Sequence, residues 1–212
     1  MRTAPAEERD AMPAHYDYLT FTLERGAWPK FSSHVRSVAA PAIAQAGGEV
    51  LGLFQGQLGF TSNEAVVLLR WPGHDRLREL DQAPGVASLH PETLTPTVRP
   101  ADGAVLRKGG IYVHRWFTVG ADNVADFVAL SNQAWTNFEG SYDTEIFGLF
   151  TAERTAQDVR EGAGRLLLLT YYASHGVWEA SRDQTRDPQG LFVKRHALTR
   201  STIGCSSLLV AP

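Results

Sequence analysis

The chain has 212 residues, of which 43% are hydrophobic and 20% charged, as is typical of a globular protein that can bury a sizeable core. A net charge of -3 argues against a nucleic-acid-binding surface, and we attribute the excess of arginine over lysine, 17 to 3, to genome composition. The lone Cys205 excludes an intramolecular disulfide and a multi-cysteine metal site.

The N-terminal segment mixes acidic and basic residues without an apolar core, which is unlike a secretory signal. The longest aliphatic run, at 166–170, is far too short to span a bilayer. We therefore predict a flexible segment over 1–13 and a cytoplasmic protein without nucleic-acid or membrane partners.

The first part of the chain predicts a strand at 16–23, where aromatic and β-branched residues gather. A helix is expected next, and a short second helix from about His74. The further predicted strands are 49–55, 65–71 and, more weakly, 93–99.

The same order of elements follows a linker at 100–110 that is rich in glycine and charge. A strand is predicted at 111–119, and apolar residues at helical spacing between Val124 and Phe138 predict a helix. A short helix is expected from about His175. The remaining predicted strands are 145–151, 166–172 and 206–211.

The two parts also share sequence. "EVLGLFQGQ" begins at Glu49 and "EIFGLFTAE" at Glu145, 96 residues later, and Tyr16, Phe21 and Phe31 have matching residues at the same offset. After a polar loop with five additional residues, the match resumes at an offset of 101. This pattern indicates a tandem duplication.

Strand, helix, strand, strand, helix, strand is the ferredoxin-like βαββαβ unit. Successive bulky residues in the first and third strands predict that both faces of each sheet are covered. We therefore predict an α+β fold in which two ferredoxin-like halves, 14–99 and 111–212, pack into one α+β barrel.

The segment "IYVHRWFTVGADNVADFVAL", followed by "EIFGLF", resembles the NIPSNAP family of dimeric α+β barrel proteins. The family's opening strand is matched by Tyr112, Arg115, Phe117, Thr118 and Val119, whereas the first half has Leu19 in place of the arginine. The resemblance implies an α+β barrel, and because barrels of this type expose sheet edges and helix faces that pair readily, we expect a homodimer. Among the family and its barrel relatives, activities range from cofactor-free oxidation to haem chemistry.

Familiar signatures of nucleotide-dependent enzymes, α/β-hydrolases and zinc peptidases are missing, so candidates come from polar residues within apolar strands. Alternation sends Tyr112, His114 and Trp116 to one face of their strand and Arg115 to the other. Arg115 would bind a carboxylate or stabilise an oxyanion, or else pair with an acid such as Glu145. His114 is a candidate general base or a core histidine.

His74 and His175 recur at equivalent positions before a short helix. The positive end of a helix favours a neutral histidine, which suits a base or a ligand. An architectural role in the helix-entry turn is the alternative. Aromatic residues of the second half could line a pocket for a flat apolar ligand or pack in the core. They are Trp116, Trp135, Phe138, Tyr142, Tyr171, Tyr172 and Trp178.

Three functions fit these residues. The leading hypothesis is a cofactor-independent lyase, isomerase or oxygenase that acts on an aromatic or apolar metabolite, with a histidine transferring a proton and Arg115 or Tyr112 polarising an oxygen. The alternatives are a haem-binding barrel with His175 as axial ligand, and a non-catalytic binding module. No metal ion is expected.

The first half has Tyr18, Leu19 and Ala39 where the second half has His114, Arg115 and Trp135. The second-half residues are more polar, more ionisable or larger, so we expect the site to be built from the second half. Alanine at His114, Arg115 or His175 should then reduce activity or ligand binding by an order of magnitude or more, and alanine at His74 by much less.

Overall fold

The computed structural model describes residues 15–71, 80, 82–183 and 189–210. The segment 1–13, predicted to be flexible, lies outside the described residues, and so does His74. The described part divides into two successive sets of four strands, separated by a segment at 97–110 without helix or strand.

The first set runs from β1 to β4. Its elements are β1 (His15–Leu23), α1 (Trp28–His34), the π-helical turn η1 (Val35–Ala39), α2 (Ala40–Gln45), β2 (Glu49–Gly56), β3 (Glu64–Trp71) and β4 (Val86–Pro96).

The second set runs from β5 to β8 and contains more helices. Its elements are β5 (Ile111–Gly120), the 3-10 turn η2 (Ala121–Asn123), α4 (Val124–Ser141), β6 (Thr144–Ala152), α5 (Ala156–Arg160), β7 (Ala163–Tyr172), α6 (His175–Ala180), α7 (Leu191–Ala197) and β8 (Thr199–Val210).

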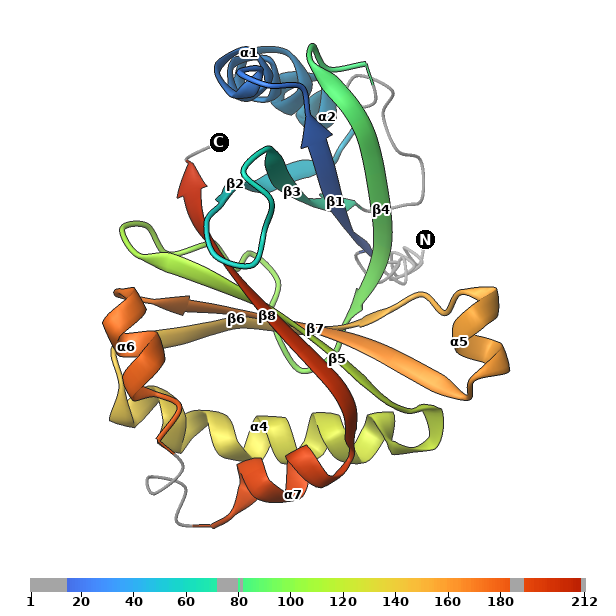
Figure 1. The fold of residues 1–212 in the computed structure, drawn as a ribbon, viewed down its shortest axis with the longest axis vertical. Helices are drawn as coiled ribbons and strands as arrows, with labels where there is room; N and C mark the ends of the chain where they lie inside the picture. Colours follow the sequence, from blue (N-terminus) through green and yellow to red (C-terminus); the bar gives the residue numbers. More distant parts are fainter. Residues whose placement is uncertain (1–14, 72–79, 81, 184–188, 211–212) are drawn as a thin grey trace, which may run out of the picture.

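The eight strands form a closed antiparallel barrel in the order β1-β3-β2-β8-β5-β7-β6-β4. Each half contributes four neighbouring strands in the ferredoxin-like order, and the halves join where β2 pairs with β8 and β4 with β6. The helices α1 and α2 cover one side of the barrel, while α4 and α7 cover the other (Figure 1). The predicted α+β barrel fold is confirmed.

The strand pairing repeats with the two offsets seen in the sequence. His15 pairs with Trp71 in the first half, and Ile111, 96 residues after His15, pairs with Tyr172, 101 residues after Trp71. The shared glycine motif also has a structural counterpart, since the register shifts between Val50 and Gly52 and again between Ile146 and Gly148. The two halves are therefore equivalent strand by strand.

The repeated glycines are required by close packing at these bulges. A Cβ atom on Gly52 would lie 2.6 Å from a Leu106 methyl group and 2.7 Å from the Phe54 ring. A Cβ atom on Gly148 would lie 2.7 Å from Pro100 and 2.8 Å from the Phe150 ring. Only glycine leaves room for the aromatic residue two positions on in each strand.

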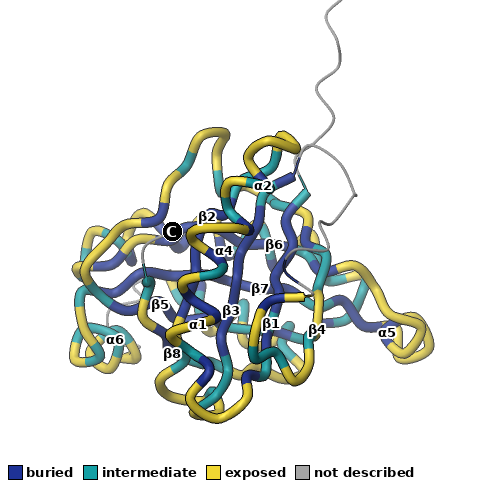
Figure 2. The backbone as a smooth tube through the Cα atoms, turned by 90° about the horizontal axis from the view of Figure 1, so that it is seen from above, coloured by how far each residue is buried: buried dark blue, intermediate teal, exposed yellow. Residues whose placement is uncertain are grey.

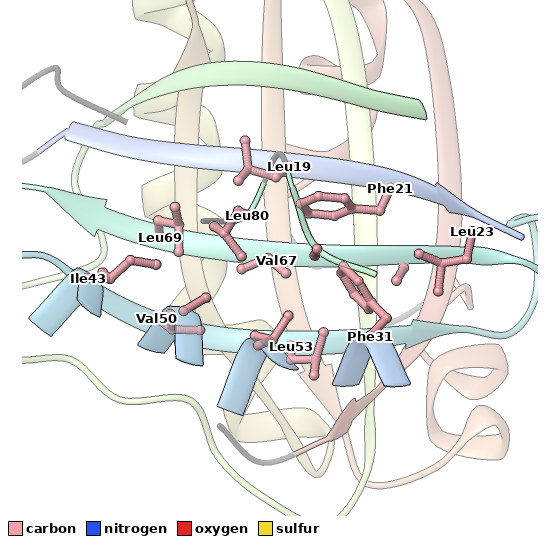
Figure 3. Close-up of a cluster of buried hydrophobic side chains, with 14 of the residues drawn as sticks. Leu19, Phe21, Leu23, Phe31, Ile43, Val50, Leu53, Val67, Leu69 and Leu80 are labelled. Atoms are coloured by element: carbon pink, nitrogen blue, oxygen red, sulfur yellow. The ribbon is translucent and has the colours of Figure 1, made fainter. Parts of the chain in front are cut away.

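Three apolar clusters fill the molecule. One occupies the barrel interior and contains residues of both halves, among them Tyr16, Phe54, Tyr112 and Phe150. Another lies between the first half's strands and α1, η1 and α2 (Figure 3). The third lies between the second half's strands and α4. The strands β1, β2, β3, β6 and β7 are accordingly buried along most of their length, whereas β4 and β8 are mostly exposed or half-buried. The helix α5 projects from the body and is largely exposed (Figure 2).

Two helices of the second half were not predicted from the sequence. Within the segment interpreted as a polar loop, Thr155 caps α5 through a capping box with Asp158. The helix α7 follows Gly190, whose φ of 63° is a left-handed conformation that suits glycine. Both helices are short, five and seven residues, so neither is long enough to show a clear apolar period.

Among the described residues, no helix is both long and apolar enough to cross a membrane. The predicted homodimer rested partly on exposed sheet edges. Every described strand, however, has a partner on both sides in the closed barrel, so that part of the argument does not apply to this chain. The homodimer and the cytoplasmic location stay predictions.

Candidate functional site

The strand β5 sends its candidate residues in opposite directions, as its alternation predicted. His114 is fully buried in the barrel interior, where it contacts Phe54 and Tyr18. Arg115 faces outward into the layer between the sheet and the helices, alongside Phe117. His114 and Arg115 therefore do not share a site.

His114 joins the two halves of the barrel. Its Nδ1 lies 2.9 Å from the Tyr18 hydroxyl, the equivalent position of the first half, and its Nε2 lies 2.7 Å from Oγ of Ser207. Burial lowers the pKa of His114 to about 3, so the ring is neutral at pH 7. A neutral, enclosed histidine with both nitrogens occupied is typical of a core residue rather than a general base.

Arg115 is the contrasting residue, because its charge is partly buried and has no counter-ion. No described side chain or carbonyl accepts a hydrogen bond from its guanidinium, and the expected pairing with Glu145 does not form. Burial lowers the pKa of Arg115, while its charge interaction with the Tyr172 hydroxyl raises it.

A cavity of about 340 Å³ adjoins Arg115. It lies between the outward face of β5, β6, β7 and β8 and the helices α4 and α7, and the residues after α6 complete its wall. In Figure 1 these helices run beneath the second-half strands. All of its described lining residues belong to the second half. Its lining mixes aromatic and aliphatic residues with polar and charged ones, and concave sites that combine apolar walls with polar groups are typical of small-molecule binding.

Four of the predicted site residues line this cavity: Arg115, Trp135, Phe138 and Tyr172. Trp135 is almost completely buried, and its indole N–H has no hydrogen-bond acceptor among the described residues. Burial raises the pKa of Tyr172, which keeps its hydroxyl protonated at neutral pH. The predicted residues thus contribute an aromatic wall and the cation of Arg115 to the cavity.

The other predicted site residues lie elsewhere. Tyr112 and Trp116 share the inward face of β5, where the Tyr112 hydroxyl donates to the carbonyl of Arg107 and Trp116 packs against Tyr18. Burial raises the pKa of Tyr112, which disfavours its ionisation. Tyr142 packs against Phe138 at the end of α4 and does not line the cavity.

His175 lies at the start of α6, which is capped by the neighbouring Ser174 as the sequence turn suggested. Its Nε2 lies 3.0 Å from Oγ of Ser206, and its ring packs near Trp178. Neither His175 nor Trp178 lines the cavity. With Nε2 occupied and the ring outside the cavity, this arrangement does not fit His175 as the axial ligand of a haem held there.

The sequence analysis missed several polar residues that line the cavity. Arg182 and Asp183 follow α6, while Arg195 and His196 lie on α7. The guanidinium of Arg195 packs over the rings of Phe117, Phe127 and Phe192. The run "KRHA" at 194–197 was the available indication, but the arginines had been attributed to genome composition.

Within the part of the chain that the structure describes, no group of three or more histidine, cysteine, aspartate or glutamate side chains is placed to hold a metal ion. What the cavity can hold is a small apolar molecule with a negatively charged or polarisable oxygen near Arg115. Arginine is well suited to both roles, since it donates several hydrogen bonds and keeps its charge.

Comparison with solved structures identifies proteins of the same fold. A candidate monooxygenase from Fusobacterium nucleatum is similar with a TM-score of 0.64 and 9% identity, covering 94% of this chain and 93% of that one. A candidate monooxygenase from Lactobacillus acidophilus has a TM-score of 0.61 and 8% identity over 93% and 94%. An anthrone oxidase-like protein has a TM-score of 0.57 and 12% identity over 93% and 92%.

No family model matches the sequence, and no curated protein matches it either. At identities this low, the similarity to solved structures shows the fold alone. The resemblance to the NIPSNAP family therefore stays a prediction, while the barrel fold that it implied is present.

Proposed function

We propose that the protein is an enzyme that binds a small aromatic or otherwise apolar molecule in the cavity beside Arg115 and transfers a proton there without a cofactor. One observation carries this proposal. A partly buried guanidinium without a counter-ion among the described residues adjoins a cavity of about 340 Å³ with aromatic walls. Buried charges in stable cores are normally paired, so an unpaired one beside a cavity favours a ligand-binding role.

In this proposal Arg115 stabilises the negative charge that develops on a substrate oxygen when a neighbouring carbon loses a proton. A fixed cation in a partly desolvated site stabilises such an enolate more strongly than water does. The base would be His196 or Asp183, which line the same cavity. His114 is less suitable because it is enclosed in the barrel interior and has a low pKa.

Three reaction classes share this first step: lyases, isomerases and oxygenases. The names of the structural relatives favour the oxygenase class. In that reaction the carbanion would add dioxygen, so that a C–O bond forms and the resulting peroxide takes up a proton. The protein would supply binding, orientation and the charge of Arg115, and dioxygen would be the oxidant.

The proposal can be tested with anthrone and phenylpyruvate, two aromatic molecules with an acidic methylene group. Exchange of the methylene protons in D₂O, followed by NMR, reports proton removal, and an oxygen electrode reports oxygenation. We expect exchange of at least one probe above the rate without protein. Arg115→Ala should reduce the rate about 10²- to 10⁴-fold, and so should whichever of His196→Ala and Asp183→Asn removes the base.

His175→Ala is the matched control, because His175 is a second-half histidine that does not line the cavity. If this variant loses the exchange reaction while His196→Ala and Asp183→Asn both keep it, the base lies outside the cavity and the proposal is wrong. A haem titration tests the main alternative, since a Soret band at one haem per chain would replace the proposal with a haem protein. Absence of binding by any probe would favour a non-catalytic module.

A further inference from the structure

The charged groups that face the cavity are mostly positive. Three guanidinium groups line it, those of Arg115, Arg182 and Arg195, against the single carboxylate of Asp183 among the described lining residues. Asp183 already takes part in another interaction. A concave, partly apolar surface with this excess of positive charge attracts an anion.

Of these three arginines, Arg115 is the one that lies on a strand of the sheet. Arg182 is exposed, whereas Arg195 is half-buried and already packs over three aromatic rings and contacts Oγ of Ser131. Arg115 sits in mid-strand with neither an ion pair nor a hydrogen-bond acceptor among the described residues, and the like charge of Arg182 acts to lower its pKa further. An anion bound at this point would pair with the guanidinium of Arg115 and would offset its repulsion by Arg182.

We infer that the ligand of this cavity carries a carboxylate on an apolar ring, and that the guanidinium of Arg115 binds the carboxylate. This inference rests on the proposed function and specifies its substrate class. The planar guanidinium can donate two parallel hydrogen bonds to a carboxylate, a geometry that lysine cannot reproduce. The ring would lie against Trp135, Phe138 and Phe192, which line the same space.

The size of the cavity agrees with such a ligand. A volume of about 340 Å³ is near the lower end of the range for small-molecule sites, which favours about one or two rings.

A matched pair of probes tests the inference: 2-naphthoate and 2-naphthamide have the same shape and differ in charge. Isothermal titration calorimetry should show that the wild-type protein binds the naphthoate about 10- to 100-fold more tightly than the amide. Arg115→Gln should bring the two dissociation constants within about threefold of each other. Arg115→Lys should keep only part of the preference, because lysine retains the charge but cannot donate two parallel hydrogen bonds to the carboxylate.

Arg25→Gln is the control for net charge, since Arg25 is an exposed arginine of the first half and its replacement removes the same charge. This variant should keep the wild-type preference within about twofold. The folded state of each variant is checked by its near-ultraviolet circular dichroism.

Equal binding of both probes to the wild type would overturn the inference, and so would an Arg25→Gln variant that loses the preference as fully as Arg115→Gln. The proposed function fails separately. If both probes bind equally while proton exchange continues, the inferred carboxylate ligand is wrong but the proposed enzymatic function is supported. If naphthoate binds with the expected preference but no exchange or oxygen uptake occurs with any probe, the ligand class stands without the reaction.

Discussion

Leu19 and Arg115 occupy equivalent positions on the outward face of β1 and β5, 96 residues apart, and their surroundings differ. Leu19 is completely buried in a cluster with Phe21, Val67 and Leu69, as Figure 3 shows. Around Arg115, by contrast, the sheet and helices leave a cavity. At the position of Leu69, 101 residues later, the second half has Thr170, which also lines the cavity.

The helices that cover the two halves of the barrel also differ. In the first half, α1, η1 and α2 follow one another without a gap, and the π-helical turn η1 comes just before Pro41, which has no N–H to donate. The second half has one uninterrupted helix, α4, of 18 residues. Equivalent strands can thus be covered by helices that pack closely against them or by helices that leave a cavity. Polar residues replace apolar ones on the strands that line the cavity.

The largest expected effect comes from comparing alanine substitutions at the two equivalent positions, Leu19 and Arg115. Leu19→Ala should lower the free energy of unfolding by about 2–5 kcal/mol, because it opens a hole in a filled cluster. Arg115→Ala should change it by less than about 1 kcal/mol, since it removes an unpaired, partly buried charge. Urea denaturation of both variants measures this. Equal destabilisation would mean that Arg115 is a packing residue like Leu19.

A second prediction concerns a feature that the halves share. Gly52→Ala and Gly148→Ala should each cost about 1–3 kcal/mol of stability, because each new Cβ would press on the aromatic ring two residues further along its strand. Thermal unfolding of the two variants provides the comparison. A loss in only one of them would contradict the equivalence of the two bulges.

The pair Tyr18 and His114 predicts a dependence on pH. The pKa of His114 is about 3 in the folded state, below the value of about 6.5 expected for the unfolded chain. The unfolded chain therefore binds more protons between these values, and stability should fall by roughly 1 kcal/mol for each unit as pH decreases from 6 to 4.

His114→Phe should flatten this slope, as measured by urea denaturation at several pH values. Through Tyr18, stability should also fall as pH rises above about 10, because burial raises the pKa of its hydroxyl in the folded state and the unfolded chain therefore loses this proton first. An unchanged slope in the His114→Phe variant would show that this histidine is not buried in the neutral form.

The smallest expected effect concerns α5, which occurs in the second half's longer loop. Thr155→Ala removes the hydroxyl that accepts from the backbone N–H of Asp158 and should cost about 0.5–1 kcal/mol. Thr61→Ala, in the corresponding loop of the first half, removes no helix cap and should cost less than about 0.5 kcal/mol. Chemical denaturation distinguishes these values, and equal costs would mean that the capping box does not stabilise α5.

The sequence by itself determined six of the strands and the barrel, because these depend on periods of two and 3.6 residues and on offsets that can be read along the chain. The bounds of the two closing strands were wrong, since 93–99 and 206–211 were predicted and β4 and β8 run over Val86–Pro96 and Thr199–Val210. Alternation along 111–119 also placed His114 and Arg115 on opposite faces. The asymmetry between Leu19 and Arg115 indicated the second half as the place for a site.

Only the tertiary structure decided where the space lies. The barrel interior is packed, while the cavity forms outside it, where α7 brings Arg195 and His196 beside a strand residue about 80 positions earlier in the chain. Whether a cavity forms depends on how fully side chains from distant parts of the chain fill the layer between the sheet and the helices. The periodicity of a local sequence segment contains no information about this packing. For the same reason the sequence could not separate Arg115, which adjoins the cavity, from His175, which does not.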